Sequence, residues 1–110
     1  AKVHGYALDP EPHEVLYDQL QLSHQLASDH RADVRDVDRL GQVVREVEPE
    51  MIFHLAAQPL VRLSYEIPVD TFAVNVMGTV HLLEAIRQSD QRCACVVITT
   101  DKCYENKEWL

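Results

Sequence analysis

The chain has 110 residues, of which 46% are hydrophobic and 25% are charged, a composition typical of one small folded domain. Its formal net charge of −8 argues against a protein that binds nucleic-acid phosphates or anionic membranes. The longest charge-free stretch, Thr71–Leu83, is shorter than the roughly 20 apolar residues of a membrane helix, so no span is predicted. Three cysteines without paired spacing favour a reducing, cytoplasmic setting.

The first half of the chain predicts a strand, a weak helix and a well-bounded helix. Residues 2–8 alternate imperfectly between apolar and polar, as in a strand, and residues 13–26 have a weak helical pattern. Residues 32–34 form a short extended candidate. Asp36 then has the character of a helix N-cap, and Pro49 stops the apolar periodicity that follows it.

The second half predicts two buried strands on either side of a long helix. Residues 51–57 form an apolar run typical of a strand buried on both faces, and residues 58–65 are expected to form a loop. Pro68 suits the first turn of a helix that ends near Gln88. Residues 93–99 predict a second buried strand. The apolar stripe of the helix consists of Phe72, Val76, Val80, Leu83 and Ile86. Strands that alternate with helices predict a parallel α/β sheet.

Polar groups follow three of the predicted strands, at the edge where open parallel sheets bind ligands. They are Asp9, the segment His54–Gln58, and the run Thr100, Asp101 and Lys102. The last run offers a hydroxyl, a carboxylate and an amine, which are suited to hydrogen bonding and acid–base catalysis if burial shifts their pKa values. From spacing alone, a solvated turn is the favoured explanation of this run.

Three motifs carry a resemblance to a known family. HLAAQP (54–59), NVMGT (75–79) and TTDKCYEN (99–106) resemble the extended short-chain dehydrogenase/reductase family. QPLVRLSY (58–65) and TDKCYENKEW (100–109) resemble more narrowly the 4,6-dehydratases that act on CDP-glucose, because dTDP-glucose dehydratases carry Glu where Lys102 stands. The resemblance implies part of a Rossmann-like doubly wound parallel sheet that lacks its first strand and the C-terminal substrate domain. Residues 1–110 would then form a partial NAD-binding domain.

By this resemblance, the enzyme removes a hydride from C4 of the hexose, eliminates water across C5 and C6, and returns the hydride to C6. Thr100 would hydrogen-bond the sugar near O4, and Asp101 would protonate the departing hydroxyl, for which its carboxyl must stay protonated. Lys102 would lie where relatives place the C5 base. A lysine is a base only when neutral, so a purely electrostatic role for Lys102 stays open.

The resemblance also implies a set of contacts to NAD. Asp9 would accept from the adenosine ribose, although a plain turn before Pro10 is an equal alternative. Asp33 and Val34 resemble an adenine-contacting pair, with an ordinary loop before a helix as the alternative. The remaining expected contacts are Ala56, Ala57 and Gln58, whose small or flexible side chains admit the dinucleotide, and Thr99 beside the nicotinamide.

Other chemically capable residues have simpler interpretations. His54 is expected to be a satisfied core histidine, and Asn75 to support the backbone through hydrogen bonds. His81 is expected on a helix surface, and Arg62 either near a diphosphate or on an exposed loop. The cysteines at 93 and 95 fit a buried strand better than a disulfide, and no metal site is predicted.

Two features of the resembled family are missing from the sequence. It has no glycine-rich phosphate turn, and none of its four tyrosines has a lysine four residues later. We therefore expect an internal fragment that is inactive alone, from an enzyme that forms homo-oligomers, with the long helix as a candidate interface. Another epimerase or dehydratase of the family, or a non-catalytic Rossmann-type module, remain the alternatives.

Overall fold

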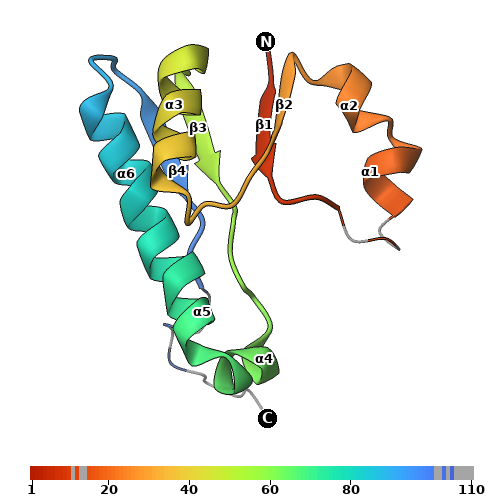
Figure 1. Ribbon diagram of the computed structural model, residues 1–110, viewed down its shortest axis with the longest axis vertical. Coiled ribbons are helices and arrows are strands. Elements are labelled where there is room, and N and C mark those ends of the chain that lie inside the picture. Colours follow the sequence, from red (N-terminus) through yellow and green to blue (C-terminus); the bar gives the residue numbers. More distant parts are fainter. Residues whose placement is uncertain (11, 13–14, 101–102, 104, 106–110) are drawn as a thin grey trace.

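The computed structural model describes residues 1–10, 12, 15–100, 103 and 105. Four strands and several helices alternate along this part of the chain (Figure 1). Their bounds are β1 His4–Ala7, α1 Val15–Gln19, α2 Leu22–Gln25, β2 Ser28–Arg31, α3 Val37–Val47, β3 Met51–His54, α4 Val61–Glu66, α5 Pro68–Phe72, η1 Ala73–Met77, α6 Gly78–Gln88 and β4 Ala94–Val97.

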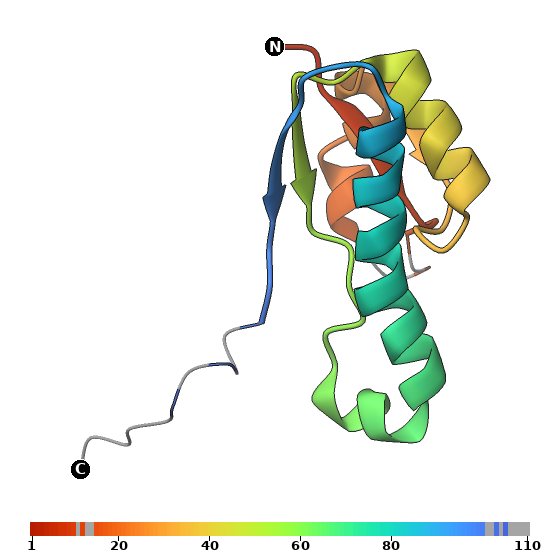
Figure 2. The same cartoon turned by 90° about the vertical axis from the view of Figure 1, so that its left-hand side faces the viewer.

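The strands form two parallel pairs. β1 pairs with β2, with His4 opposite Ser28, and β3 pairs with β4, with Met51 opposite Ala94. All four strands run in the same direction, so their carboxyl ends lie on the same side of the molecule (Figures 1 and 2). The predicted α/β class with parallel strands is confirmed, because each pair is joined by a helical crossover.

Helices α3 and α6 lie side by side and cover one face of β3 and β4 (Figure 1). Their contact is the hydrophobic core, and partly buried strand residues pack against it. The core members are Leu40, Val44, Leu82 and Ala85, and the residues packed against them are Tyr6, Ile52, Ile86 and Cys95. Both strand pairs therefore reach the same core, β1 through Tyr6 and β3 through Ile52.

The two predicted helix starts are confirmed. The Asp36 carboxylate accepts a hydrogen bond of 3.0 Å from the backbone N–H of Arg39, as an N-cap should, and Pro68 occupies the first turn of α5. The helical stretch Pro68–Gln88 has 21 residues and contains an 18-residue window with a mean hydropathy of 1.2, which by length and composition alone is enough to cross a membrane. Leu82 and Ala85 instead pack this stretch against the core.

A π-helical turn, η1, interrupts the long helix between α5 and α6. The backbone N–H of Gly78 bonds to the carbonyl of Ala73, five residues back, where an α-helix would bond four residues back. Single π turns within α-helices are frequent at functional sites. The sequence pattern did not predict this turn.

Two sequence-based boundaries were wrong. Residues 32–34, expected to be extended, form the turn after a strand that occupies the more polar segment 28–31. Pairing with β1 selects that segment, which has little strand character of its own. Residues 58–65, expected to form a loop, contain most of α4. This helix has no N-cap side chain that would predict its start from the sequence.

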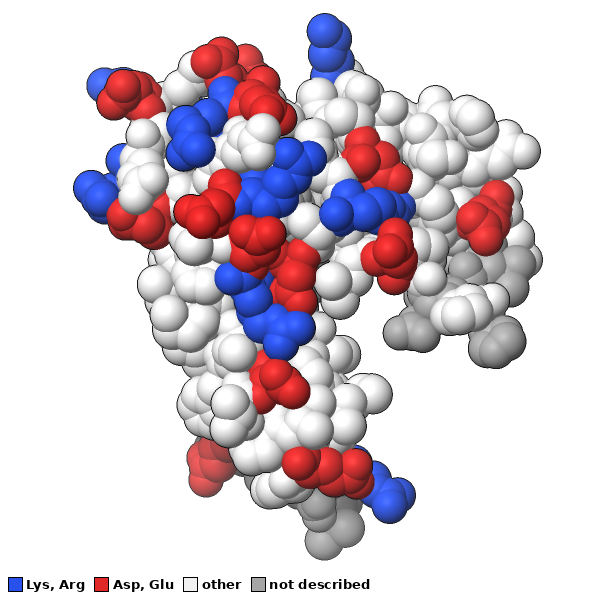
Figure 3. Space-filling model, viewed as in Figure 1, with Lys and Arg blue, Asp and Glu red and all other residues white. Residues whose placement is uncertain are grey.

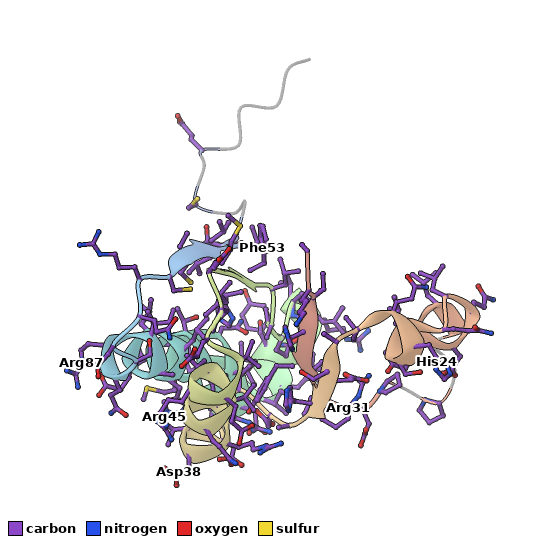
Figure 4. The ribbon with its side chains drawn as sticks, turned by 90° about the horizontal axis from the view of Figure 1, so that it is seen from above. His24, Arg31, Asp38, Arg45, Phe53 and Arg87 are labelled. Carbon is purple, nitrogen blue, oxygen red and sulfur yellow. The ribbon has the colours of Figure 1, made fainter. Side chains whose placement is uncertain are left out.

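The expectation that 51–57 is buried on both faces was also wrong. Met51 is 54% exposed and Phe53 is 62% exposed, whereas Ile52 and His54 face the helices. Figure 4 places Phe53 on the side of the sheet opposite α3, which carries Asp38 and Arg45. β4 alternates in the same way, so only one face of this strand pair is covered by the part of the chain that the structure describes.

The apolar stripe predicted on the long helix points mostly to solvent. Of its five members, only Ile86 packs against the core, and the other four are exposed: Phe72, Val76, Val80 and Leu83. The buried helix positions are instead the smaller Gly78 and Ala85 together with Leu82. The helix is therefore apolar on two sides, and hydrophobic periodicity alone could not select the side that meets α3.

Candidate functional site

The predicted site residues lie in loops that leave the carboxyl ends of the strands. Asp9 follows β1 by two residues and is exposed, and Asp33 and Val34 are half-buried in the turn after β2. The segment 56–58 follows β3, and Thr99 and Thr100 are exposed beyond β4. All of these loops share one side of the molecule, which is the arrangement that binds ligands in open parallel sheets.

The turn after β2 is held by hydrogen bonds to Asp33. Its carboxylate accepts from the Arg35 backbone N–H at 2.8 Å and from the Arg35 guanidinium at 2.6 Å, and these bonds lower the pKa of Asp33. Its carbonyl accepts from the Tyr6 hydroxyl at 2.9 Å. Arg35 also reaches Asp70 of α5, at 3.1 Å. The turn is thus fixed to β1 and to the long helix together.

Gly78 explains how the same turn approaches the long helix so closely. A Cβ atom at Gly78 would lie 2.6 Å from Cγ2 of Val34, too close for any real contact. The ring of His81 adds a second attachment, since its Nδ1 lies 3.1 Å from the carbonyl of Val34. The expectation that His81 is a plain helix-surface residue was therefore wrong, because this contact leaves it half-buried.

The loop after β3 is clamped by Asn75 of the π turn. The Asn75 Oδ1 accepts from the backbone N–H of Gln58 at 2.7 Å, and its Nδ2 donates to the Gln58 carbonyl at 3.1 Å. The Gln58 side chain accepts from the Leu60 N–H at 2.7 Å and donates to the Thr71 hydroxyl at 3.1 Å. The prediction that Asn75 supports backbone through hydrogen bonds is confirmed.

The end of β3 also contains the buried histidine. His54 is 6% exposed, and its Nε2 lies 3.0 Å from the hydroxyl of Thr79. Burial lowers its pKa, since the charged form is disfavoured away from water. His54 is therefore a satisfied core histidine, as predicted.

The third polar run is only partly described. The backbone carbonyl of Thr100 accepts from the Cys103 thiol at 3.3 Å, and the Thr100 side chain is exposed. Asp101 and Lys102, the predicted acid and the predicted base or electrostatic group, lie outside the described residues. Their roles stay predictions.

The remaining candidates are Arg62 and the three cysteines. The Arg62 side chain is 96% exposed on α4 and pairs with Glu66 at 3.5 Å. The cysteines at positions 93, 95 and 103 are free, and burial raises the pKa of Cys93. Within the described ranges, no three metal-ligating side chains come together. Acidic and basic side chains are interspersed on the face shown in Figure 3, so the excess negative charge is not gathered there in one patch.

Sequence reasoning missed two contributors to this edge. Arg35 pairs with two carboxylates, Asp33 and Asp70, and nothing in the sequence marks Asp70 as its partner, since they lie 35 residues apart. The role of Thr79 depends on the π turn, which has no sequence pattern of its own. The hydrogen bonds of Tyr6 to Asp33 and of Asn75 to Gln58 hold the backbone of two of these loops in place.

Comparison with known proteins identifies the family. The sequence profile of the GDP-mannose 4,6 dehydratase family matches residues 9–108. The chain belongs to this family. It is 50% identical over 110 residues to CDP-glucose 4,6-dehydratase of Salmonella typhimurium strain LT2, covering all of this chain and 30% of that protein. It is also 47% identical over 62 residues to UDP-glucose 4-epimerase of Mycolicibacterium smegmatis, covering 56% of this chain and 20% of that one.

A solved structure supports the fold. The chain superposes on a UDP-glucose-4-epimerase of Stenotrophomonas maltophila, solved with bound NAD and formylated UDP-arabinopyranose, with a TM-score of 0.79 and 22% identity. The match covers 98% of this chain and 32% of that one. The chain thus spans about a third or less of the length of the relatives it matches.

Proposed function

We propose that this chain is the dinucleotide-binding part of an NAD-dependent 4,6-dehydratase that converts CDP-glucose to CDP-4-dehydro-6-deoxyglucose. The observation that carries the proposal is the 50% identity to CDP-glucose 4,6-dehydratase over the whole chain. The matching family, GDP-mannose 4,6 dehydratase, is also named for the 4,6-dehydration of a nucleotide sugar, which supports the reaction class.

The loops at the carboxyl ends of the strands are suited to a dinucleotide, because the segment after β3 has small side chains at two positions and a backbone held by hydrogen bonds. Ala56 and Ala57 leave room beside the segment that Asn75 clamps at Gln58, and Thr99 lies beyond the next strand of the pair. Asp9 is exposed after β1 and is suited to accept from ribose hydroxyls. NAD, when bound, supplies the acceptor and later the donor of the hydride.

Asp33 and Val34 are expected to contribute to the NAD site through their backbone more than through their side chains. The Asp33 carboxylate is held ionised by Arg35 and is already engaged by it, so it is an acceptor only. Val34 packs against Gly78, which fixes the turn in place. We expect this pair to shape the adenine end of the site, where the resemblance implies an adenine-contacting pair.

The catalytic steps are assigned to the run after β4. Thr100 would hydrogen-bond the sugar near O4, and Asp101, kept protonated, would give its proton to the leaving C6 hydroxyl. Lys102 would take the C5 proton if neutral, or stabilise the developing negative charge if charged. An Asp101→Asn change separates these roles from binding, because it removes the proton donor at nearly constant shape.

The test uses the natural full-length protein that carries this chain, incubated with CDP-glucose. We expect a 4-keto-6-deoxy product that has lost one water, and a rate roughly 10²- to 10⁴-fold lower for Asp101→Asn with substrate affinity retained. We expect the 110-residue chain alone to be inactive and to bind NAD poorly. An unchanged sugar in the presence of the native protein would reject the proposed reaction.

A second candidate is epimerisation, favoured by the 47% identity over 62 residues to a UDP-glucose 4-epimerase. Epimerisation inverts C4 and loses no water, so the mass of the product distinguishes the two reactions. A UDP-glucose incubation in parallel identifies the preferred nucleotide. An isomeric product from either sugar would favour the epimerase.

The full-length enzyme is proposed to be a cytoplasmic homo-oligomer that uses the exposed stripe of the long helix. Phe72 and Val76 line an apolar hollow of about 510 Å³, and the exposed Val80 and Leu83 follow them along the helix. Apolar patches of this kind mark interfaces between proteins. We expect Val76→Asp to lower the mass measured by analytical ultracentrifugation, and an unchanged mass would reject this interface.

A further inference from the structure

His54 has a buried position and a hydrogen bond that the roles above do not explain. Its neighbours in β3 alternate between exposed and half-buried, whereas its own side chain is 6% exposed. A buried polar group is costly unless it is paired, and its partner here is the hydroxyl of Thr79, 3.0 Å away on α6. A leucine would fill the same place without that cost, so the hydrogen bond calls for an explanation.

The direction of this hydrogen bond follows from the second bond that Thr79 makes. Its hydroxyl lies 2.8 Å from the backbone carbonyl of Asn75, and a carbonyl only accepts, so the single hydroxyl proton is used there. The Thr79 oxygen must then accept from His54, which places a proton on Nε2. Three groups are thus linked in one direction, from the His54 ring through Thr79 to Asn75.

The last group in this chain of bonds lies in the π turn. Backbone hydrogen bonds in this turn reach five residues back, as the bond from Gly78 to Ala73 shows. The Thr79 hydroxyl bonds the Asn75 carbonyl from only four residues away, and so ties the widened turn to the regular helix after it. The side chain of Asn75 leaves the same turn to clamp both backbone groups of Gln58.

We infer that His54 is a positioning residue, whose Nε2–H orients Thr79 and thereby fixes the π turn that makes Asn75 hold the Gln58 segment for a dinucleotide. The inference rests on the proposed dinucleotide site for its purpose, but not for its geometry. His54 lies at the end of the strand that leads into this segment. The histidine therefore connects the beginning of the segment to the helix that clamps its end.

The test compares variants of the natural full-length protein that keep or lose one donor. His54→Gln keeps an N–H near the Nε2 position, and His54→Leu removes it at similar size. Thr79→Ser keeps the hydroxyl, and Thr79→Val removes it. Val43→Ala, in the buried core of α3, is the matched control for a general loss of stability.

The first readout is hydrogen exchange of the Gln58 amide without any nucleotide, and the second is the dissociation constant for NAD. We expect His54→Leu and Thr79→Val each to raise the exchange rate of the Gln58 amide and the dissociation constant for NAD by about tenfold. A tenfold change corresponds to the loss of one hydrogen bond of about 1.4 kcal/mol. His54→Gln, Thr79→Ser and Val43→Ala should stay within about twofold of the native protein. If His54→Leu does not fold, Thr79→Val carries the comparison.

Unchanged exchange in Thr79→Val and His54→Leu would overturn the inference, and so would equal changes in the Val43→Ala control. The result for NAD is separate. If the native protein binds no NAD but exchange at Gln58 follows the expected order, the positioning role stands and the proposed function fails. If the native protein binds NAD and neither readout responds to the variants, the proposed function stands and this inference fails.

Discussion

The two strand pairs of this chain are built in contrasting ways. β3 and β4 lie on the helix layer, whose core of Leu40, Val44, Leu82 and Ala85 is nearly excluded from water. β1 and β2 reach that core through Tyr6, and their side chains make several hydrogen bonds, among them His4 with Ser28 and Arg31 with Asp29. One pair is therefore held mainly by burial of apolar surface, which does not depend on direction, and the other by hydrogen bonds and ion pairs, which do.

The polar side of the first pair is best seen around Asp29. Its carboxylate accepts from the hydroxyl of Tyr17 in α1 and from the Arg31 guanidinium at 2.6 Å, and these bonds lower its pKa. The guanidinium lies 4.4 Å from the centre of the Tyr17 ring, a cation–π contact. Such groups fix α1 on the sheet with little buried apolar surface, so the first pair should tolerate truncation of an apolar side chain better than the second.

The largest effect is expected from truncating a core leucine. Leu82→Ala should lower the free energy of unfolding by about 2–5 kcal/mol, because Leu82 is buried between α6 and α3. Leu22→Ala, at the one half-buried position of the otherwise exposed α2, should cost less than about 1.5 kcal/mol. Urea denaturation followed by circular dichroism measures both. Equal losses would show that the two pairs are built alike.

The next effect concerns the contact that joins the two pairs. Gly78→Ala places a Cβ atom against Val34, and we expect a loss of about 1–3 kcal/mol in unfolding free energy. Gly41→Ala is the matched control. Its Cβ would meet only the flexible end of Arg45, at 3.3 Å, so it should be neutral or stabilising by up to about 1 kcal/mol. A Val34→Ala change should restore most of the loss in Gly78→Ala, and no restoration would argue against this contact.

As the pH falls, the second strand pair should lose stability before the first. Burial holds the pKa of His54 below its ordinary value of 6.5. Below pH 6.5 the unfolded chain therefore binds this proton more readily than the folded chain, and stability falls by at most about 1.4 kcal/mol per pH unit. We expect a decline between pH 7 and 5 that His54→Gln removes. A decline of the same slope in His54→Gln would assign it to another group.

The carboxylates of the first pair act at lower pH. Asp29 and Asp33 have pKa values below the ordinary 3.8, because of hydrogen bonds from Tyr17 and Arg35 respectively. Their contribution to stability is complete above pH 3.8 and is lost as the pH falls through their folded-state values. The resonances of Tyr17 and Arg31 should therefore change below pH 4 only.

The smallest effect is expected at the ion pair between Arg35 and Asp70, whose side chains are 43% and 59% exposed. Asp70→Asn should cost no more than about 1 kcal/mol, and 1 M salt should abolish the difference. Glu66→Gln breaks a pair within one helix and provides the control. If Asp70→Asn matched Gly78→Ala, the ion pair and not the packing would join the two strand pairs.

The contrast also explains what the sequence could and could not predict. Helix α3 was predicted with its Asp36 cap, and the long helix with its Pro68 start, because these signals are local. The position of β2 was missed, because a strand of polar residues is selected by pairing with β1. The predicted site residues do lie in loops that leave the carboxyl ends of the strands. The side of the long helix that is buried depends on contact with α3, and the sequence of the helix alone does not indicate it.

The part of the site that could not be predicted is the part that depends on distant contacts. Asn75 and Gln58 were each singled out, but their pairing across 17 residues requires the π turn to aim the amide. The link from Arg35 to Asp70 spans 35 residues, and neither residue has a local reason to meet the other. Local patterns identify candidates, and tertiary geometry decides which of them meet.

The parallel pairing of the strands has a consequence for how the chain acquires its structure. His4 pairs with Ser28, 24 residues later, and Met51 pairs with Ala94, 43 residues later, so neither pair can begin as a hairpin. Closing the longer connection costs about 0.5 kcal/mol more entropy than closing the shorter one. Contacts so far apart in sequence form slowly. The helices between the strands should therefore acquire structure before either pair closes, and the long helix would then bring β4 back to β3.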